Sequence, residues 1–363
     1  MCTGIRLKAL DGTAVHARTL EFAVDILSDL IVVPKGYERV GSTPTIGKKL
    51  PLPGKKWTSK YASVGMSGLG LPVIFDGLNE VGLAIGLFFF PGFAEYMPYS
   101  PSDAENTIAP WEVGSWILEN CKTVEQVRSE IINNIVVPNV IFAEFDPDAP
   151  PPVHFVVHDA SGKSIVIEYV GGKPIVHDNP LGVITNSPTF DWHMTNLRNY
   201  VNFSFTNSPG MKLGSVQLSS LGQGSGMLGM PGDFTPPSRF VRAVAYSQSV
   251  SEEFNKESSE GEHFHATTGK EAILQAFHIL NNFDIPKGVA RENEHIEAGT
   301  KKTFVPADYT LWTSASDLKA KQYYFRTYEN SQIRMVDLNA HKDRSLEIAR
   351  ISIAGEEKIQ TVD

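Results

Sequence analysis

The first part of the chain alternates short apolar and polar stretches, which is the pattern of half-buried β-strands. Residues 3–7 and 13–18 flank the turn Asp11-Gly12, so we expect a β-hairpin at the start of the chain. The same kind of pattern predicts further strands over residues 26–33, 63–66, 72–75, 82–90, 140–144, 153–158, 164–169, 173–177, 309–313, 322–327 and 333–337.

A smaller set of segments has features that are typical of helices. Pro110 stands at the start of a predicted helix over 110–120, a position where its missing N–H costs no hydrogen bond. Thr123 and Gln126 form a capping-box pattern at the start of a helix over 124–133. Further helices are predicted over residues 192–201, 239–247 and 270–281, whereas residues 205–232 and 251–269 are predicted to be loops.

The order of the predicted elements is strands, two helices, strands, helices and strands. A parallel sheet would need a regular alternation of strand and helix along the chain. The observed order instead predicts an α+β fold in which helices cover antiparallel sheets. The chain contains no internal repeat and no evident linker, so we expect a single domain over residues 2–363.

Composition argues against several classes of protein. Hydrophobic residues make up 42% of the 363 residues, but no uninterrupted apolar run reaches the length of about 18 residues that a membrane-spanning helix needs. The net charge is −9 and no long Lys/Arg stripe offsets it, so we expect no nucleic-acid partner. The two cysteines, Cys2 and Cys121, are too few for a disulfide framework or a thiolate metal site.

The start of the chain bears on its compartment. No secretory signal precedes Cys2, which predicts a cytoplasmic protein for the sequence as written. A periplasmic or secreted protein would have the same sequence if an export signal had been removed and Met1 added, so the compartment stays open.

Cys2 is the residue with the most specific chemistry. Removal of Met1 would leave one residue that carries both a thiol and a free α-amine. An α-amine has a reference pKa of about 8 and can accept a proton near neutral pH, and a thiol is a strong nucleophile. Cys2 could therefore supply both nucleophile and base, although a cysteine at position 2 taken alone is usually incidental.

Motifs along most of the chain place Cys2 in a wider context. They are MCTG at 1–4, ARTLE at 17–21, FDGLNEVGL at 75–83, FFFPG at 88–92, ITNSPTFDW at 184–192, LRNY at 197–200, MPGD at 230–233, SRFVR at 238–242, YTLWT at 309–313 and YYFRTY at 323–328. In this order they resemble the choloylglycine hydrolase family, which includes conjugated bile salt hydrolases and penicillin V acylases. The resemblance covers nearly the whole chain.

The resemblance implies the four-layer αββα sandwich of N-terminal-nucleophile hydrolases, with two antiparallel sheets between helix layers. It implies that Cys2 is the nucleophile and that its freed amine is the base. Arg18 would lie beside the thiol and favour the thiolate by its opposite charge. Without the surrounding motif, Arg18 would be interpreted as a surface strand residue. No metal and no organic cofactor would be required.

Two expected site positions depart from the family's pattern. Glu21 stands where much of the family has Asp; its implied role is to hold and orient the Cys2 amine, and its extra methylene changes its reach. Phe89 stands where many bile salt hydrolases have Asn. A backbone N–H of the segment 88–92 would still donate to the oxyanion, but a side-chain contact would be lost. The aromatic replacement favours the penicillin V acylase branch.

Two further positions match the pattern. Asn186 would donate its side-chain amide to the oxyanion of the tetrahedral intermediate, a contact worth about 3 kcal/mol. The alternative for Asn186 is a turn residue ahead of Ser187-Pro188. Arg239 would lie near Cys2 and orient it or tune its charge, and the alternative is a helix-surface arginine next to Arg242.

Other patterns carry little weight. Residues 224–229 fit G-x-G-x-x-G, but prolines follow and prevent a helix from starting there, which argues against a dinucleotide site. His154 and His158 lie in a strand pattern and are expected to be ordinary strand residues. His263 and His265 form a pair in a polar loop, too few ligands for zinc.

The sequence thus predicts an enzyme that cleaves a linear amide between an apolar acyl group and a polar amine. The favoured substrates, in order, are penicillin V or a related acylated side chain, conjugated bile salts and N-acyl homoserine lactones. The alternatives are a catalytically inactive family member that binds acyl amides and a plain structural α+β protein. The family resemblance also implies a homotetramer.

Overall fold

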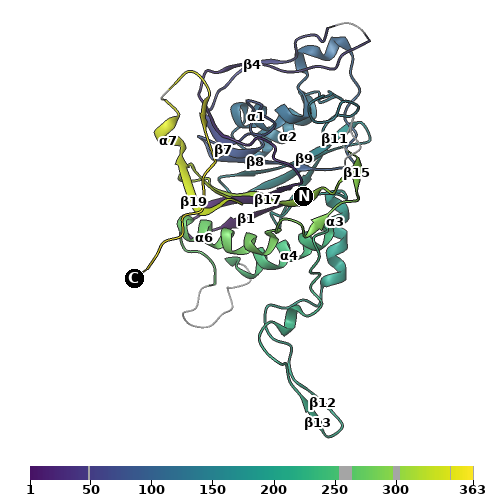
Figure 1. The fold of residues 1–363 in the computed structure, drawn as a ribbon, viewed down its shortest axis with the longest axis vertical. Coiled ribbons are helices and arrows are strands. Elements are labelled where there is room, and N and C mark those ends of the chain that lie inside the picture. The colour runs from purple at the N-terminus through teal and green to yellow at the C-terminus, as the bar shows by residue number, and fades with distance from the viewer. Residues whose placement is uncertain (48–49, 253–263, 297–302, 344, 363) are drawn as a thin grey trace.

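Two antiparallel sheets lie face to face at the centre of the molecule, with helices on both outer faces (Figure 1). The computed structural model describes residues 1–47, 50–252, 264–296, 303–343 and 345–362. Helices α4 (Pro236–Ser249) and α6 (Gly269–Leu280) pack on one sheet, and α1 (Val113–Asn120) and α2 (Val124–Asn133) pack on the other. This arrangement confirms the expected four-layer αββα sandwich.

The first sheet joins the two ends of the chain. Within the described residues it has six strands, of which five run in the order β1 (Cys2–Lys8), β2 (Ala14–Phe22), β17 (Ala307–Asp317), β18 (Gln322–Thr327) and β19 (Asn330–Asp337), with β14 (Ala290–Arg291) paired to β17. The predicted hairpin around Asp11-Gly12 is confirmed by the pairing of Cys2 with Leu20 and of Lys8 with Ala14. The strand predictions at 309–313, 322–327 and 333–337 are also confirmed.

The second sheet is built from the middle of the chain and closed by a late strand. In the part of the chain that the structure describes, its eight strands run in the order β11 (Lys173–Asp178), β10 (Ser164–Val170), β9 (Val153–Asp159), β8 (Leu83–Phe89), β7 (Asp76–Asn79), β6 (Ser63–Met66), β3 (Leu30–Val33) and β20 (Ala349–Ile351). β8 and β9 are almost wholly buried because sheet and helix layers cover both of their faces.

The space between the sheets contains a polar cluster as well as apolar side chains. His16 Nε2 lies 2.7 Å from Asp76 Oδ1, and both side chains are fully buried. The other carboxylate oxygen accepts hydrogen bonds of 2.7 Å from Ser314 and Tyr323. Burial alone would raise the pKa of Asp76, but His16, Arg18 and Ser314 lower it below its ordinary value. Asp76 is therefore ionised, and its pair with His16 links the two sheets.

The helix starts follow the predicted chemistry. Pro110 begins a 3₁₀ turn, η2 (Pro110–Glu112), which continues into α1. Thr123 Oγ1 accepts from the Gln126 N–H at 3.2 Å and caps α2 as expected. In a capping box, the Gln126 side chain would accept from the N–H of the cap residue, Thr123. Here it accepts from the N–H of the preceding residue, Lys122, at 3.1 Å.

Three strand predictions need correction. Residues 72–75 form no strand, because Ile74 N–H donates to Ser115 Oγ of α1 at 2.8 Å, and the strand is the next segment, β7. Residues 140–144 belong to a turn, in which Phe142 is bridged to Asp146 and the Asp146 side chain accepts from the following backbone. Within 26–33 only the last four residues form a strand.

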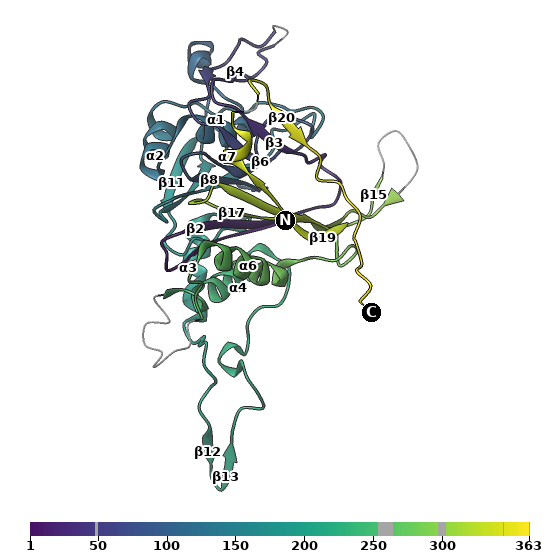
Figure 2. The ribbon, with the colours of Figure 1, turned by 90° about the vertical axis from the view of Figure 1, so that its left-hand side faces the viewer.

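Residues 205–232, predicted to be a loop, contain the small hairpin β12 (Met211–Leu213) and β13 (Val216–Leu218). This hairpin projects far from the sandwich (Figure 2). Most of the predicted loop 251–269 lies outside the described residues.

The remaining elements are β4 (Glu38–Val40), β5 (Lys56–Thr58), η1 (Pro101–Asn106), α3 (Phe190–Asn196), η3 (Leu197–Tyr200), η4 (Ser225–Met227), η5 (Asn281–Phe283), β15 (His295–Ile296), β16 (Thr303–Phe304) and α7 (Leu338–His341). Among the described residues, no helix has the length and apolar character needed to cross a membrane.

Candidate active site

Cys2 opens β1 at the edge of the first sheet and pairs with Leu20 of β2. It is 4% exposed and lines an apolar pocket. Arg18 pairs with Gly4 in the same register. Residues two apart along a strand share a face, and directly paired residues do as well, so the side chains of Cys2 and Arg18 lie on the same face of the sheet.

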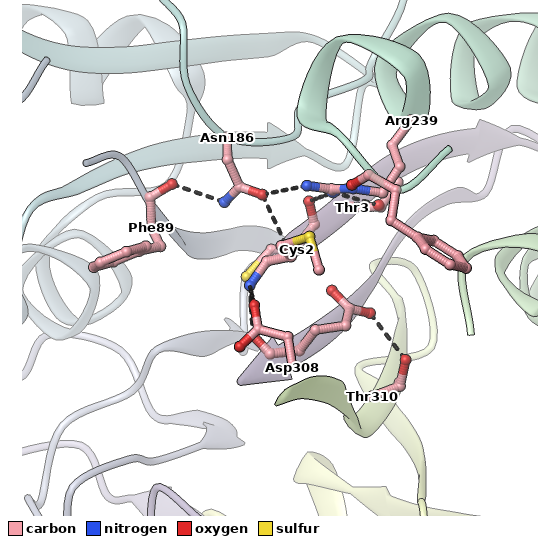
Figure 3. A network of polar contacts seen from close by, with 10 residues as sticks. Cys2, Thr3, Phe89, Asn186, Arg239, Asp308 and Thr310 are labelled. Atoms are coloured by element: carbon pink, nitrogen blue, oxygen red, sulfur yellow. Dashed lines mark hydrogen bonds and ion pairs between the residues drawn. The ribbon is translucent and has the colours of Figure 1, made fainter. Parts of the chain in front are cut away.

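Asn186 is the centre of the polar contacts around Cys2 (Figure 3). Its Oδ1 accepts from the Cys2 nitrogen at 2.9 Å and from Arg239 Nη2 at 2.7 Å. Its Nδ2 donates to the main-chain oxygen of Phe89 at 2.7 Å. An amide nitrogen has two hydrogens, so one N–H remains for a further acceptor. The structure thus brings three other predicted site residues, Cys2, Phe89 and Arg239, into contact with the Asn186 side-chain amide.

Arg239 lies inside the protein rather than on the surface of α4. Its Nη1 donates to the main-chain oxygen of Cys2 and, at 2.9 Å, to Thr3 Oγ1, and its Nε donates to Phe234 O at 2.8 Å. Burial lowers the pKa of the guanidinium from its ordinary value, while Glu21 and Cys2 act against that change. Arg239 lies on α4 and donates hydrogen bonds to two residues of β1. It therefore holds the start of β1 against α4.

The start of the chain extends strand β1 by one residue. The Glu21 N–H donates to Met1 O at 2.8 Å, and Glu21 O accepts from the Met1 α-ammonium at 2.7 Å. The same ammonium lies 3.1 Å from Asp308 Oδ2 of β17. With Met1 present, the nitrogen of Cys2 is an amide that donates to Asn186, and it is not a free base.

The Glu21 carboxylate lies beside this segment and is 1% exposed. Its Oε1 accepts from Thr310 Oγ1 at 3.2 Å, and its Oε2 has no hydrogen-bond partner among the described residues. Burial raises the pKa of Glu21 above its ordinary value, opposed chiefly by the N-terminal ammonium and Arg239. With Met1 present, the carboxylate therefore accepts from Thr310, while the Cys2 nitrogen donates to Asn186 instead.

Arg18 is fully buried between the sheets rather than on the surface. Its Nη1 donates to Leu87 O of β8, and Leu87 lines the same pocket as Cys2. Its guanidinium carbon lies 4.2 Å from the centre of the Phe88 ring and 5.2 Å from that of Trp312, contacts that favour a cation. Gly4 permits this packing, because a Cβ there would lie 2.6 Å from the Phe88 ring.

Aromatic side chains dominate the pocket beside Cys2. Its enclosed volume is ≈ 70 Å³, and the space rises to ≈ 580 Å³ only when the open mouth is included. Besides Cys2 and Glu21, the lining residues are Leu20, Phe22, Ile26, Leu69, Phe75, Leu87, Phe89, Trp111, Phe145, Pro151 and Val153. Phe89 packs edge-on against Phe22 and Phe145, with ring centres 6.1 and 6.4 Å apart. Phe89 therefore contributes a wall through its ring and a hydrogen-bond acceptor through its backbone.

A buried network holds the segment that carries Asn186. Glu168 Oε1 accepts from the Phe190 N–H at 2.9 Å and lies 3.2 Å from His154 Nδ1, and His154 Nε2 lies 3.2 Å from Thr185 O. Burial would raise the pKa of Glu168, but hydrogen bonds from His154 and His177 lower it to about 2. Glu168 thus fixes both ends of the turn around Asn186.

His193 of α3 supports Asn186 from the other side. Its Nε2 lies 2.9 Å from Asn186 O, and its ring stacks on Phe240, with ring centres 4.7 Å apart. Burial lowers the pKa of His193 to about 4, so the ring is neutral near pH 7 and its Nε2–H donates to the carbonyl. Phe240 is the residue after Arg239 in α4. Through His193, Asn186 is therefore packed against the same helix turn that carries Arg239.

Sequence reasoning did not find several residues of this neighbourhood. Thr3, Asp308 and Thr310 contact Arg239, the Met1 ammonium and Glu21 respectively. Thr3 and Thr310 lie within the motifs quoted above, which gave a signal without a role. Asp308 lies just outside a motif and had no signal.

Among the described residues, the patterns that carried little weight in the sequence line no part of the pocket, although His154 supports the segment that carries Asn186. Residues 224–229 contain the short 3₁₀ turn η4, and no strand of the described chain leads into them. The expectation that the following prolines prevent a helix was wrong, because Pro236 and Pro237 form the first turn of α4, where a missing N–H costs no hydrogen bond. His154 and His158 both lie on β9; His154 contacts Glu168, and burial lowers the pKa of His158 well below its ordinary value. His263 lies outside the described residues. Within the described part of the chain, no group of three or more His, Cys, Asp or Glu side chains could hold a metal ion.

The chain is similar to known proteins along most of its length. The sequence model of the family "Linear amide C-N hydrolases, choloylglycine hydrolase family" matches residues 2–349. The "Bile salt hydrolase/transferase" of Clostridium perfringens is 35% identical over 343 residues, covering 93% of each chain. The "Penicillin V acylase" of Pectobacterium atrosepticum is 27% identical, covering 89% of this chain and 77% of that protein.

Solved structures give the same result for the fold. The structure of the mutant C2A conjugated bile acid hydrolase from Clostridium perfringens superposes with a TM-score of 0.80, at 31% identity and with full coverage of both chains. These matches define a hydrolase of linear amide carbon–nitrogen bonds. The chain belongs to the choloylglycine hydrolase family.

Proposed function

We propose that this chain is a cysteine N-terminal-nucleophile amidase whose active site is the pocket at Cys2. Removal of Met1 frees the Cys2 amine, which takes the thiol proton as Sγ attacks the amide carbon. A carbon–sulfur bond forms, the carbonyl oxygen becomes an oxyanion, and collapse breaks the carbon–nitrogen bond as the amine leaves with the proton. Water then hydrolyses the thioester and releases the acid.

The other predicted site residues have distinct roles in this proposal. Arg18, on the same face of the sheet as Cys2, favours the thiolate by its charge. Glu21 holds the freed amine through its carboxylate. Asn186 donates its remaining N–H to the oxyanion, together with a backbone N–H of the segment around Phe89. Arg239 fixes Cys2 through its main-chain oxygen.

One observation carries the proposal. The Cys2 side chain lines a pocket whose other walls are almost entirely apolar, while its backbone is held by Asn186 and Arg239. An apolar acyl group can fill such a pocket and bring its amide carbon to the sulfur. The polar amine half would remain at the open mouth of the pocket.

Conjugated bile salts are the substrate class that we place first. The relative that is 35% identical over 93% of the chain is a bile salt hydrolase/transferase, whereas the penicillin V acylase is 27% identical. This order reverses the one favoured by Phe89 in the sequence. Penicillin V stays the second candidate, because the rings of Phe22, Phe89 and Phe145 also suit an aromatic acyl group.

A side-by-side assay tests the proposal. Release of the amine is measured with glycocholate, taurocholate, penicillin V and a long-chain N-acyl homoserine lactone, with Cys2→Ala protein as the blank. We expect the highest kcat/KM for a conjugated bile salt, at least about tenfold above penicillin V, which corresponds to about 1.4 kcal/mol of differential binding. Penicillin V in first place would restore the order that Phe89 suggested. Binding of these amides without any release would instead support the inactive acyl-amide-binding alternative.

The projecting hairpin supports a second proposal, that the chain assembles into a homotetramer. Met211, Leu213, Val216 and Leu218 are all exposed, at 57%, 57%, 56% and 41%. An apolar arm that leaves the body of a protein is typical of a surface that packs on another chain. Copies of this chain are the occupant that we propose, since symmetric self-association is the commonest form of assembly.

Changing these four apolar residues to serine is expected to break the assembly. Light scattering should give the wild type four times the chain mass of 39.9 kDa and the variant one or two times that mass. The matched control changes Lys212 and Gln217, the polar positions of the same hairpin, to serine and should keep the wild-type mass. A tetramer in the four-serine variant would rule out the arm as the contact, and a monomeric wild type would rule out assembly.

A further inference from the structure

A β-bulge lies directly opposite Glu21. β17 pairs with β2 so that Trp312 faces Leu20 and Thr310 faces Glu21, which leaves Leu311 as the extra residue. A register continued from the Trp312–Leu20 pair would place Leu311 opposite Glu21. The bulge therefore brings a hydroxyl, rather than an isobutyl group, to the buried carboxylate. Bulges are frequently found where a side chain beside an active site has to be redirected.

The Thr310 hydroxyl is oriented by a second contact. Its oxygen accepts from the Ile285 N–H at 2.9 Å, and the Thr310 N–H donates to Ile285 O at 3.1 Å. Because one lone pair is taken by a donor, the hydroxyl proton is free for Glu21 Oε1 at 3.2 Å. The backbone at Ile285, just after α6 and η5, thus fixes Thr310, and Thr310 is 3% exposed.

The charges around Glu21 show why a neutral hydrogen-bond donor matters for the ionisation of its carboxyl. Cations face the carboxylate from the chain start, from Arg239 of α4 and from Arg18 of β2, while Asp308 of β17 competes for the α-ammonium. Burial nevertheless raises the pKa of Glu21, and the hydroxyl of Thr19 on β2 also acts against that rise. A neutral donor to a buried carboxylate favours its charged form without repelling the amine that the carboxylate has to hold.

We propose that Thr310 is a positioning residue that keeps the Glu21 carboxylate ionised and its free oxygen Oε2 directed at the Cys2 amine. The inference rests on the proposed role of Glu21 in holding that amine. Thr310 also compensates for the extra methylene of Glu21, because it fixes Oε1 of the longer side chain and leaves Oε2 without a partner among the described residues.

Thr310→Val, which removes the hydroxyl at nearly constant shape, tests the inference in Met1-free protein. A hydrogen bond to a charged group is lost, so we expect the pKa of the Glu21 carboxyl to rise by about one unit. The pKa is measured by ¹³C NMR of carboxyl-labelled glutamate, with Glu21→Gln used to assign the signal. The acid limb of the kcat profile should move to higher pH by the same amount, with KM nearly unchanged. Thr310→Ser should restore both.

The NMR titration needs no substrate, so it separates this inference from the proposed function. An unchanged Glu21 titration in Thr310→Val would overturn the role of Thr310, whatever the activity of the enzyme. A raised Glu21 pKa with an unmoved acid limb would mean that Thr310 does not act on catalysis through Glu21. Thr107→Val serves as the control for loss of a buried threonine hydroxyl, since Thr107 Oγ1 donates to Asp103 O at 2.8 Å and Thr107 does not line the pocket.

Discussion

Replacing Cys2 with alanine is expected to lower kcat for amide hydrolysis by at least about 10⁴-fold, because no other group can form the acyl-enzyme. The fold should survive, since the deleted sulfur is a single atom at the edge of a pocket and the Cys2 backbone contacts to Asn186 and Arg239 remain. The measurement is amine release under saturating substrate, with binding of the uncleaved amide followed in parallel. Turnover that persists in Cys2→Ala would reject Cys2 as the nucleophile.

The second cysteine provides the matched control for this experiment. Cys121 is fully buried at the end of α1, and burial raises the pKa of its thiol to about 12. Cys121→Ala should therefore keep nearly wild-type kcat. Intact-mass measurement of each sample shows whether Met1 is present, and protein that retains Met1 should be as inactive as Cys2→Ala because its Cys2 nitrogen is an amide.

Regular elements were predictable where one local pattern decided the structure. Residues 63–66 form β6, and Thr123 caps α2, because alternation and capping chemistry lie within a few neighbouring residues. β7 was missed because Asp76, Gly77 and Asn79 are poor strand formers. Their strand exists through partners that are far away in sequence, such as Ser314 and Tyr323 for Asp76.

The projecting hairpin shows a different failure. Alternation of apolar and polar residues was present in Met211-Lys212-Leu213 and Val216-Gln217-Leu218, on either side of Gly214, which has the positive φ of +59° that such a turn requires. The surrounding Gly/Ser-rich stretch outweighed this signal. A pattern confined to three residues on each side is too short to stand out from a composition that is typical of loops.

The candidate site was predictable through motif resemblance but not in its contacts. Cys2, Asn186, Phe89 and Arg239 lie together in the structure, although they come from four separate segments. The contact of Glu21 with Thr310 could not be predicted from the sequence. It depends on a one-residue bulge in a strand that lies 289 positions away. Register over such a distance is set by the packed sheet, not by any local pattern.

Asn186→Ala is expected to lower kcat by about 10²- to 10³-fold, with a smaller effect on KM, because an oxyanion donor acts mainly in the transition state. A further loss comes from the ground state, since Arg239 Nη2 and the Cys2 nitrogen would lose their shared acceptor. The matched control is Asn199→Ala on the exposed turn η3. The Asn199 side chain donates to the neighbouring Asn196 at 3.1 Å, and the kcat of this variant should stay near the wild-type value.

Asn186→Asp separates the two roles of this side chain. Aspartate keeps an acceptor oxygen for Cys2 and Arg239 but has no N–H for the oxyanion or for Phe89 O, and its charge opposes the developing negative charge. If oxyanion donation dominates, Asn186→Asp should be at least as impaired in kcat as Asn186→Ala while its melting temperature stays closer to that of the wild type. If holding Cys2 and Arg239 dominates, Asn186→Asp should recover most of the activity, and the oxyanion role would pass to the backbone around Phe89 alone.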